Sequence, residues 1–277
     1  MLPSMIYGVT MVKNEQPTIA HSIEHLLAEG VDHIIVANNL STDRTGEILS
    51  AIIARGWPVT VLEDSELAYD QGRKVTRLAD MAREAGATWI IPFDADELWV
   101  STTPGQTLAE VLGFSTEADV LVADWFDHLP PLSPGFGRPF YRRMPRRNRV
   151  ANGLTKVAFR ALPGIRVHDG NHDVDGIAQL RRVEGRIYIH HYRWRSLRHF
   201  VKKTRNGLRV MEAGGDALPL VLCSEWRRYG RRGLLHLALT YINLIRTQRA
   251  SGTVKDDRQP TRLTQGTLGG DSRSMRT

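Results

Sequence analysis

The chain has 277 residues, 42% of them hydrophobic and 24% charged, an ordinary globular composition that suits one large α/β domain or two small ones. It lacks a long uncharged apolar span and a signal-peptide pattern, and its single cysteine, Cys223, excludes an internal disulfide and a cysteine-based zinc site, so a cytoplasmic location is the default expectation. The formal net charge of +7 and the pI of about 9.8 favour an anionic partner, such as nucleic acid, a phosphate-bearing ligand or a membrane surface.

Strand and helix patterns alternate through the first hundred residues. Apolar, β-rich runs predict strands over residues 6–12, 33–37 and 59–62, and from residue 89 to Asp94. Apolar residues at helical spacing predict a helix after each of the first three strands, ending at Gly30, Gly56 and Gly86. Connections of this length imply parallel strands in one sheet with helices on its faces, so the predicted fold class is α/β with a mostly parallel sheet.

Polar clusters follow three of these strands, at Asn14-Glu15, at residues 38–43 and at residues 94–97. The carboxyl ends of parallel strands meet at one rim of the sheet, where open α/β folds bind ligands. We therefore expect these clusters to build one site. The chain contains no Gly-x-Gly-x-x-Gly and no Walker A sequence, so neither standard phosphate loop is present.

The rest of the chain has a less regular pattern. The expected elements are a short helix over 107–112, a strand over 119–125, an irregular stretch over 130–139, short strands and turns over 157–189, a strand over 187–192, a basic amphipathic helix over 197–210, a more apolar helix over 234–245 and a disordered tail over 251–277. The helix over 234–245 is expected to be a core helix with a basic end, and contact with a membrane surface is the alternative.

Three carboxylates end the apolar run that begins at Trp89: Asp94, Asp96 and Glu97. In an extended segment Asp94 and Asp96 point to the same side, because side chains alternate along a strand. Two carboxylates on one side repel each other unless a cation lies between them, and Mg²⁺ or Mn²⁺ prefers such oxygen ligands. A solvated acidic turn is the alternative, but buried strands seldom end in clustered acids without a counter-charge.

The order and spacing of several motifs carry a family likeness. These motifs are Met11 to Glu15, Asn38 to Thr45, Phe93 to Leu98, Gly170-Asn171-His172, and a later group with His191-Tyr192, Arg195-Ser196-Leu197, Phe200, Lys203 and Gly207. Together they resemble family 2 glycosyltransferases, and most of all a subgroup whose metal motif reads Asp-x-Asp-Glu-Phe. Leu98 replaces the phenylalanine, and Asn38-Asn39 stand where relatives carry Asp-Asp or Asp-Asn. The resemblance covers about residues 6–207.

The resemblance implies a GT-A fold and an inverting, hexosyltransferase-type reaction with a nucleotide-sugar donor, a divalent cation (Mn²⁺ or Mg²⁺) and an acceptor hydroxyl. UDP-sugars are the favoured donors. Residues 1–128 would form the nucleotide-sugar-binding half, and residues 129–250 the acceptor-side half with basic helices. The implied donor contacts are Thr10, Asn14, Glu15, Asn38, Asn39, Asp43, Arg73, Asp94 and Ala95. Asn14 and Asp43 are alternatively helix caps, and Arg73 alternatively belongs to a solvated helix start.

The resemblance implies Asp94, Asp96 and His191 as metal ligands. Ile187 and Ile189 alternate with Tyr188 and His190, so His191 should share the interior side of its strand with the two isoleucines. A packed core histidine is the alternative for His191.

An inverting transfer needs a base that takes the proton of the acceptor hydroxyl. Asp173, together with His172, fits the expected place in the sequence, and Asp169 and Asp127 are rivals.

Two other classes of function stay open at this point. A metal-dependent nucleotidyltransferase or phosphotransferase also uses paired aspartates. Arginines crowd residues 138–149, and a second basic group covers residues 193–205; these clusters suit a non-catalytic nucleic-acid binder. The charge distribution favours an acidic metal site facing basic walls over a uniformly basic nucleic-acid binder, and the nucleotide-sugar partner is what the resemblance implies. The acceptor is undefined and would be a small molecule, a glycan or a lipid-linked molecule; peripheral membrane contact is the further partner considered.

Overall fold

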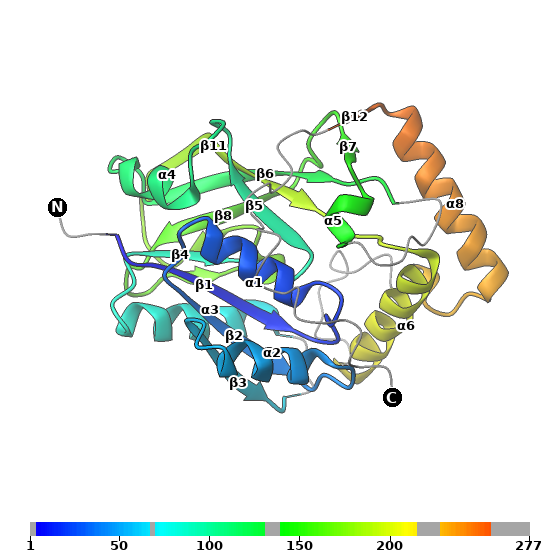
Figure 1. Cartoon of the computed structure of the whole chain (residues 1–277), viewed down its shortest axis with the longest axis horizontal. Coiled ribbons are helices and arrows are strands. Elements are labelled where there is room, and N and C mark those ends of the chain that lie inside the picture. The colour runs from blue at the N-terminus through cyan, green and yellow to red at the C-terminus, as the bar shows by residue number, and fades with distance from the viewer. Residues whose placement is uncertain (1–3, 67–69, 131–138, 215–227, 256–277) are drawn as a thin grey trace.

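The computed structural model describes residues 4–66, 70–130, 139–214 and 228–255. Its centre is an eight-stranded sheet in the order β3-β2-β1-β4-β8-β6-β11-β5 (Figure 1). The strands are β1 (Ile6–Val12), β2 (His33–Asn39), β3 (Val59–Asp64), β4 (Trp89–Pro92), β5 (Glu97–Ser101), β6 (Val120–Asp127), β8 (Thr155–Arg160) and β11 (Arg182–His191). Strands β3, β2, β1 and β4 are parallel neighbours, β6 is parallel to β11, and β8 and β5 run antiparallel to their neighbours.

Helices α1 (Ile19–Ala28), α2 (Thr45–Ala54), α3 (Gln71–Glu84) and α4 (Leu108–Phe114) cover the two faces of this sheet. The short α5 (Phe140–Arg143), α6 (Leu197–Gly214) and α8 (Leu234–Ala250) follow them along the chain. A 3₁₀ turn, η1 (Asp169–Asn171), and two small sheets complete the described chain. These sheets pair β9 (Arg166–Val167) with β10 (Val174–Asp175), and β7 (Arg146–Asn148) with β12 (Thr253–Lys255).

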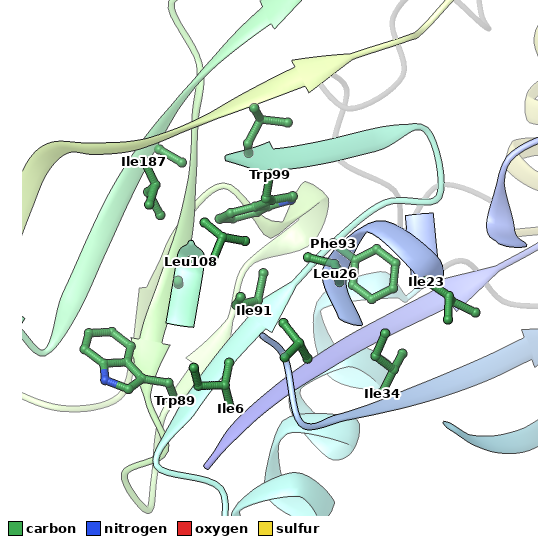
Figure 2. Close-up of a cluster of buried hydrophobic side chains, with 14 of the residues drawn as sticks. Ile6, Ile23, Leu26, Ile34, Trp89, Ile91, Phe93, Trp99, Leu108 and Ile187 are labelled. Carbon is green, nitrogen blue, oxygen red and sulfur yellow. The ribbon is translucent and has the colours of Figure 1, made fainter. Parts of the chain in front are cut away.

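The core has one layer on each face of the sheet. On one face, side chains of α1, α2 and α4 pack against Trp89, Phe93 and Trp99, as Figure 2 shows for Ile23 and Leu26 of α1 and for Leu108 of α4. On the other face α3 packs its own apolar stripe on β1 and β2. Each large apolar side chain buried in this way contributes about 1.5–3 kcal/mol to folding. The predicted fold class, α/β with a mostly parallel sheet and helices on both faces, is confirmed.

A smaller core joins the two long C-terminal helices. Phe200 of α6 packs with Leu237, Tyr241 and Ile245 of α8, and Leu129 and Trp194 complete the cluster. Strands β8 and β11 follow residue 128 and yet belong to the main sheet, so the two expected halves share one sheet. The donor-binding role of residues 1–128 and the acceptor-side role of residues 129–250 stay predictions.

The segment expected to be a disordered tail starts with ordered structure. Residues 253–255 form β12, which pairs with β7 and thereby satisfies its backbone groups. That part of the expectation is wrong, and the remainder, residues 256–277, lies outside the described residues. None of the described helices has the length and apolar character needed to cross a bilayer.

Candidate functional site

The Asp94-Ala95-Asp96 segment forms a turn. Strand β4 ends at Pro92, β5 begins at Glu97, and the Glu97 backbone N–H donates to the Asp94 carbonyl at 3.0 Å. The extended geometry expected for this segment is therefore wrong. Because β4 lies between β1 and β8 while β5 pairs with β11 at the sheet edge, the chain has to change direction between them. As a consequence, the two aspartates contact different partners.

Asp94 contacts a buried lysine. Its Oδ2 lies 2.6 Å from Lys156 Nζ, and its Oδ1 accepts hydrogen bonds from the amides of Gln71 and Asn171 at 3.2 Å. Lys156 Nζ also lies 2.7 Å from Oε1 of the buried Glu97. Burial would lower the pKa of Lys156, but the two carboxylates hold it above its ordinary value, whereas burial raises the pKa of Glu97. Lys156 is thus the counter-charge for both acids.

Asp96 is buried, and its neighbours are basic side chains from the end of β11 and from the segment that leads into and forms α6. Its Oδ2 lies 2.6 Å from Lys203 Nζ and 3.6 Å from the Arg195 guanidinium, and its Oδ1 lies 3.9 Å from His191 Nε2. Arg195 also donates to Glu15 at 3.1 Å. Burial alone would raise the pKa of Asp96, yet Lys203, His191 and Arg195 hold it well below its usual range. Asp96 is therefore ionised and placed to meet positive charge.

The β5–β11 pairing brings His191 to this turn. His191 lies opposite Glu97 in the antiparallel register, and the Tyr192 backbone N–H donates to the Asp96 carbonyl at 2.9 Å. His191 shares a sheet face with the residues around Ile189, whereas His190 lies within hydrogen-bonding distance of His128, at 2.9 Å. Ile187 and Ile189 belong to the cluster that contains Trp125, on which His191 stacks, whereas the ring of His190 lies 5.1 Å from that of Tyr188. These contacts confirm the alternation expected for this strand.

A carboxylate and an indole fix the orientation of His191. Its Nδ1 lies 2.6 Å from Asp127 Oδ1, and its ring stacks on Trp125 with ring centroids 4.8 Å apart. Asn152 donates to the other Asp127 oxygen at 2.6 Å. Burial would raise the pKa of Asp127, but the hydrogen bond with His191 keeps it below its ordinary value. This arrangement leaves Nε2 of His191 directed to Asp96.

Asp96 and His191 fit the requirements of a divalent cation. Two ligands that each lie roughly 2.0–2.2 Å from one ion are at most about 4.4 Å apart, and Asp96 Oδ1 and His191 Nε2 are 3.9 Å apart. Asp127 supplies the outer carboxylate that metal-binding imidazoles commonly have. Within the described ranges no three His, Cys, Asp or Glu side chains gather around one ion position. Among the described residues, Asp96 and His191 are therefore the two candidate ligands of one ion.

At the rim of the sheet, just after β1, Asn14 holds the turn that connects β2 to α2. Its Oδ1 accepts the backbone N–H groups of Thr42 and Asp43 at 2.8 and 3.1 Å, and its own N–H donates to Ser41 at 3.0 Å. Asn14 itself has a positive φ of 60°, which asparagine tolerates better than most residues. Asp43 in turn accepts from the Thr45 backbone at the start of α2. Asn14 thus holds the turn between β2 and α2 rather than capping α1.

Asn38 and Asn39, which stand where the resembling family carries acidic residues, pair with acids on the neighbouring strand β3. In the β2–β3 register Asn38 lies beside Glu63 and Asn39 beside Asp64, with amide-to-carboxylate distances of 3.1 and 2.9 Å. Lys74 Nζ lies 2.7 Å from Asp64. This rim therefore still carries carboxylates, supplied by β3 in place of β2.

Other expected donor contacts differ in their surroundings. Thr10 and Ala95 are buried, and among the described residues the Thr10 hydroxyl has no hydrogen-bond partner. Arg73 lies at the exposed start of α3, paired with Asp70 at 2.6 Å and with Glu66 at 2.5 Å. The predicted donor role of Arg73 is untested, and binding a phosphate would require it to leave these two carboxylates.

The loop after β9 brings His172 toward the turn formed by Asp94, Ala95 and Asp96. Its Nδ1 lies 2.8 Å from the Thr155 carbonyl, which only accepts, so Nδ1 carries the proton and Nε2 the lone pair. Gly170 has a φ of +76°, and a Cβ there would lie 2.6 Å from His172 Nε2, so glycine is required beside that atom. Asp173 instead pairs with Arg182 at 2.6 Å and is about half exposed.

His172 and Asn171 connect this loop to Trp125 and to Asp94, respectively. Asn171 donates to Asp94, and the His172 ring meets Trp125 edge-on with centroids 5.3 Å apart. Trp125 stacks on His191. Burial, followed by the charge of Lys156, lowers the pKa of His172 below its ordinary value. The geometry therefore brings a neutral imidazole to the aspartate turn.

Sequence reasoning missed Lys156 and the pair Glu63 and Asp64. The signal for the two acids was present, because β3 is another β-rich strand that ends in carboxylates, as the run ending at Asp94 does. Lys156 stands alone in the apolar strand β8, and a buried lysine in such a strand requires a carboxylate partner. That signal predicts a partner but does not say which one.

Comparison with known proteins gives one family match. A family model described as Glycosyl transferase family 2 matches residues 9–160, more than half of the chain. No curated protein sequence matches the chain.

Several solved structures are similar at low identity. TarS from S. aureus in complex with UDP is 12% identical, with 89% of this chain and 72% of that chain covered and a TM-score of 0.43. The mannosyltransferase PcManGT from Pyrobaculum calidifontis in complex with GDP-Man and Mn²⁺ is 14% identical, with 89% and 73% covered and a TM-score of 0.46. Glucosyl-3-phosphoglycerate synthase from Mycobacterium tuberculosis is 19% identical, with 45% and 44% covered and a TM-score of 0.31.

Proposed function

The chain belongs to glycosyl transferase family 2, and from this premise we propose that it moves a hexose from a nucleoside diphosphate sugar to an acceptor hydroxyl with inversion at the anomeric carbon. The observation that carries the proposal is the convergence of Asp94, Asp96 and His191 at one rim of the sheet, beside the buried Lys156 and the partly exposed Lys203. We also propose membership of the subgroup with the Asp-x-Asp-Glu-Phe-like motif, because Asp94 to Leu98 reproduce its pattern with one apolar exchange.

The nucleoside would lie against the rim of β1, β2 and β3. The amide groups of Asn38 and Asn39 donate to Glu63 and Asp64, so the amide oxygens and the two carboxylates are the acceptors offered to a base and a ribose. Uridine is the favoured base, because the family resemblance implies UDP-sugars as donors. The turn held by Asn14 would border the nucleoside on the α2 side.

The diphosphate would lie at the aspartate turn, where Lys203 and Arg195 approach Asp96. Negative charge grows on the diphosphate oxygen as its bond to the sugar breaks, and fixed cations in a buried site stabilise that charge. A divalent cation held by Asp96 and His191 would add Lewis-acid stabilisation of the same charge when bound. Mn²⁺ or Mg²⁺ suits this oxygen-rich environment, with the imidazole favouring Mn²⁺.

His172 is the base that this geometry favours. Its Nε2 would take the proton of the acceptor hydroxyl, while the hydroxyl oxygen forms the new bond to the anomeric carbon. The bond from that carbon to the diphosphate breaks on the opposite side, and its electron pair leaves with the diphosphate. Thr155 holds the tautomer that this step requires. Asp173, the other residue expected from the sequence, would first have to leave Arg182.

The test of the proposed reaction is the identity of its phosphorus product. The full chain is incubated with a panel of UDP- and GDP-sugars, with Mn²⁺ or Mg²⁺, and products are identified by ³¹P NMR. A glycosyltransferase releases the nucleoside diphosphate. Sugar 1-phosphate, the leaving group when the nucleotidyl group is transferred, or a newly phosphorylated product would instead assign a nucleotidyl or phosphoryl transfer, and no turnover with any donor would leave the nucleic-acid-binding alternative.

Replacing His172 with glutamine should lower kcat/KM by about 10²–10⁴-fold, the usual contribution of a general base. The pH profile gives the sharper readout. Because burial lowers the pKa of His172, the wild-type acid limb should have its midpoint below the ordinary histidine value of 6.5, with activity falling as the imidazole gains a proton. The variant should lose that limb.

The neighbouring Asp173→Asn is the matched control for this experiment, and it should keep most of the activity. If Asp173→Asn lost activity while His172→Gln retained both its rate and its acid limb, the base would be Asp173.

Replacing His191 with alanine should raise the Mn²⁺ concentration required for half-maximal activity by at least about tenfold, because one of two protein ligands is lost. Asp127→Asn should cause a smaller rise in the same direction, since Asp127 orients the ring. The measurement is a metal titration of donor hydrolysis. Identical titrations for wild type and His191→Ala would make His191 a packed core residue.

A further inference from the structure

Helix α8 has apolar side chains on two opposite faces. On the inner face Leu237 and Tyr241 are buried against the core that α8 shares with α6. On the outer face Leu235, Leu239 and Ile242 are 76%, 59% and 45% exposed. Their i, i+4, i+7 spacing places them in one stripe along the helix. A single exposed leucine needs no explanation, but a continuous apolar stripe marks a contact surface.

The chain around this stripe is basic and has no acid of its own. Between residues 228 and 255 it contains no aspartate or glutamate. The basic residues in that stretch are Arg228, Arg231, Arg232, Arg246, Arg249 and Lys255. Arg246 follows Ile242 by one helical turn and is exposed, so it continues the stripe at its C-terminal end. Arg231 pairs with Glu212 of α6 at 2.8 Å, at the other end. The stripe therefore lies between two groups of positive charge.

Figure 1 shows α8 at the periphery of the molecule, with α6 beside it. We propose that the outer face of α8 lies on an anionic phospholipid membrane. The leucines and the isoleucine would enter the boundary between headgroups and acyl chains, and the arginines would meet lipid phosphates. This surface acts independently of the sugar transfer proposed above.

Charge decides between a membrane and a second copy of the chain. In a two-fold dimer the same patch meets itself, so the arginines at the ends of the stripe would face a partner surface that is equally basic. Residues 228–255 contain no carboxylate, and Glu212 of α6 already pairs with Arg231 of the same chain. An anionic bilayer offers both an apolar interior for the stripe and negative charge for its flanks.

The test is co-sedimentation of the full chain with vesicles. We expect binding to vesicles of phosphatidylcholine mixed with phosphatidylglycerol, little binding to phosphatidylcholine alone, and weaker binding as the salt concentration rises. The triple variant L235Q/L239Q/I242Q should bind at least about tenfold more weakly, because the inserted apolar area is lost. I53Q is the matched control: Ile53 of α2 is as exposed as Ile242, at 45%, and its loss should leave binding unchanged.

Three results would overturn the membrane proposal: no binding of the full chain to anionic vesicles, equal binding by the triple variant, or a wild-type dimer that the triple variant converts to a monomer. Light scattering of both proteins without lipid detects the last. Donor hydrolysis in detergent-free buffer is measured in parallel and should be the same for wild type and triple variant. Failure of vesicle binding with intact hydrolysis thus rejects the membrane surface alone.

Discussion

Asp96→Asn should lower kcat/KM for sugar transfer by about 10²–10³-fold, the loss typical when one preorganised electrostatic group is removed from a site. Asparagine keeps the shape of the side chain but not its charge. Lys203 and Arg195 would then lack their shared carboxylate, and the cation position proposed beside His191 would lose the carboxylate of Asp96 as a ligand. The measurement is the initial rate of nucleoside diphosphate release at saturating Mn²⁺.

The fold should survive this substitution, because Arg195 retains Glu15 and Lys203 is partly exposed. Circular dichroism and thermal unfolding check that point. Asp175→Asn is the control, since Asp175 pairs with Arg166 and His168 on the surface. An Asp96→Asn enzyme that retained the wild-type rate would remove the aspartate turn from the mechanism.

Lys156→Met should destabilise the protein by about 3–5 kcal/mol, the usual cost of removing one member of a buried ion pair. Lys156 is buried and lies between Asp94 and Glu97, at 2.6 and 2.7 Å. Methionine fills a similar volume but leaves the Glu97 carboxylate without its cation. The free energy of unfolding is measured by urea titration. A double variant that adds Glu97→Gln should recover much of the loss.

The loss should also depend on pH. Burial raises the pKa of Glu97 in the folded state, and removing Lys156 removes the charge that opposes this rise. Folding then favours the protonated carboxyl, so this group contributes stability at low pH and loses it as the pH rises through the folded-state pKa. The difference between wild type and Lys156→Met should therefore be largest near neutral pH and shrink as the pH falls. A pH-independent difference would mean that Glu97 does not depend on Lys156.

The parallel part of the sheet could be predicted because its information is local. Each strand is a short apolar run, a glycine follows shortly after each of α1, α2 and α3, and residues 6–12 form β1 as expected. The face of His191 could also be predicted, since side-chain alternation requires only the neighbouring Ile187 and Ile189. The shape of the aspartate turn could not, because it depends on the distant pairing of β5 with β11.

The partners within the site depend on contacts between distant segments. Lys156 and Asp94 are 62 positions apart, and no periodic pattern connects them. The pairing of Asn38 with Glu63 follows from the β2–β3 register, which the sequence does not specify. The choice between His172 and Asp173 rests on which side chain the loop directs to Thr155 and which to Arg182. Sequence alone therefore located the rim but not its ion pairs.

The most direct test of the central claim is a crystal structure of the full chain with Mn²⁺ and the nucleoside diphosphate that the donor screen identifies. The account predicts the base in contact with Asn38 or Asn39, the diphosphate beside Lys203 and Arg195, and the cation bound by Asp96 and His191. A nucleotide bound away from the carboxyl ends of β1, β2 and β4, or one that touches neither asparagine and leaves Asp96 paired only with Lys203, would contradict it.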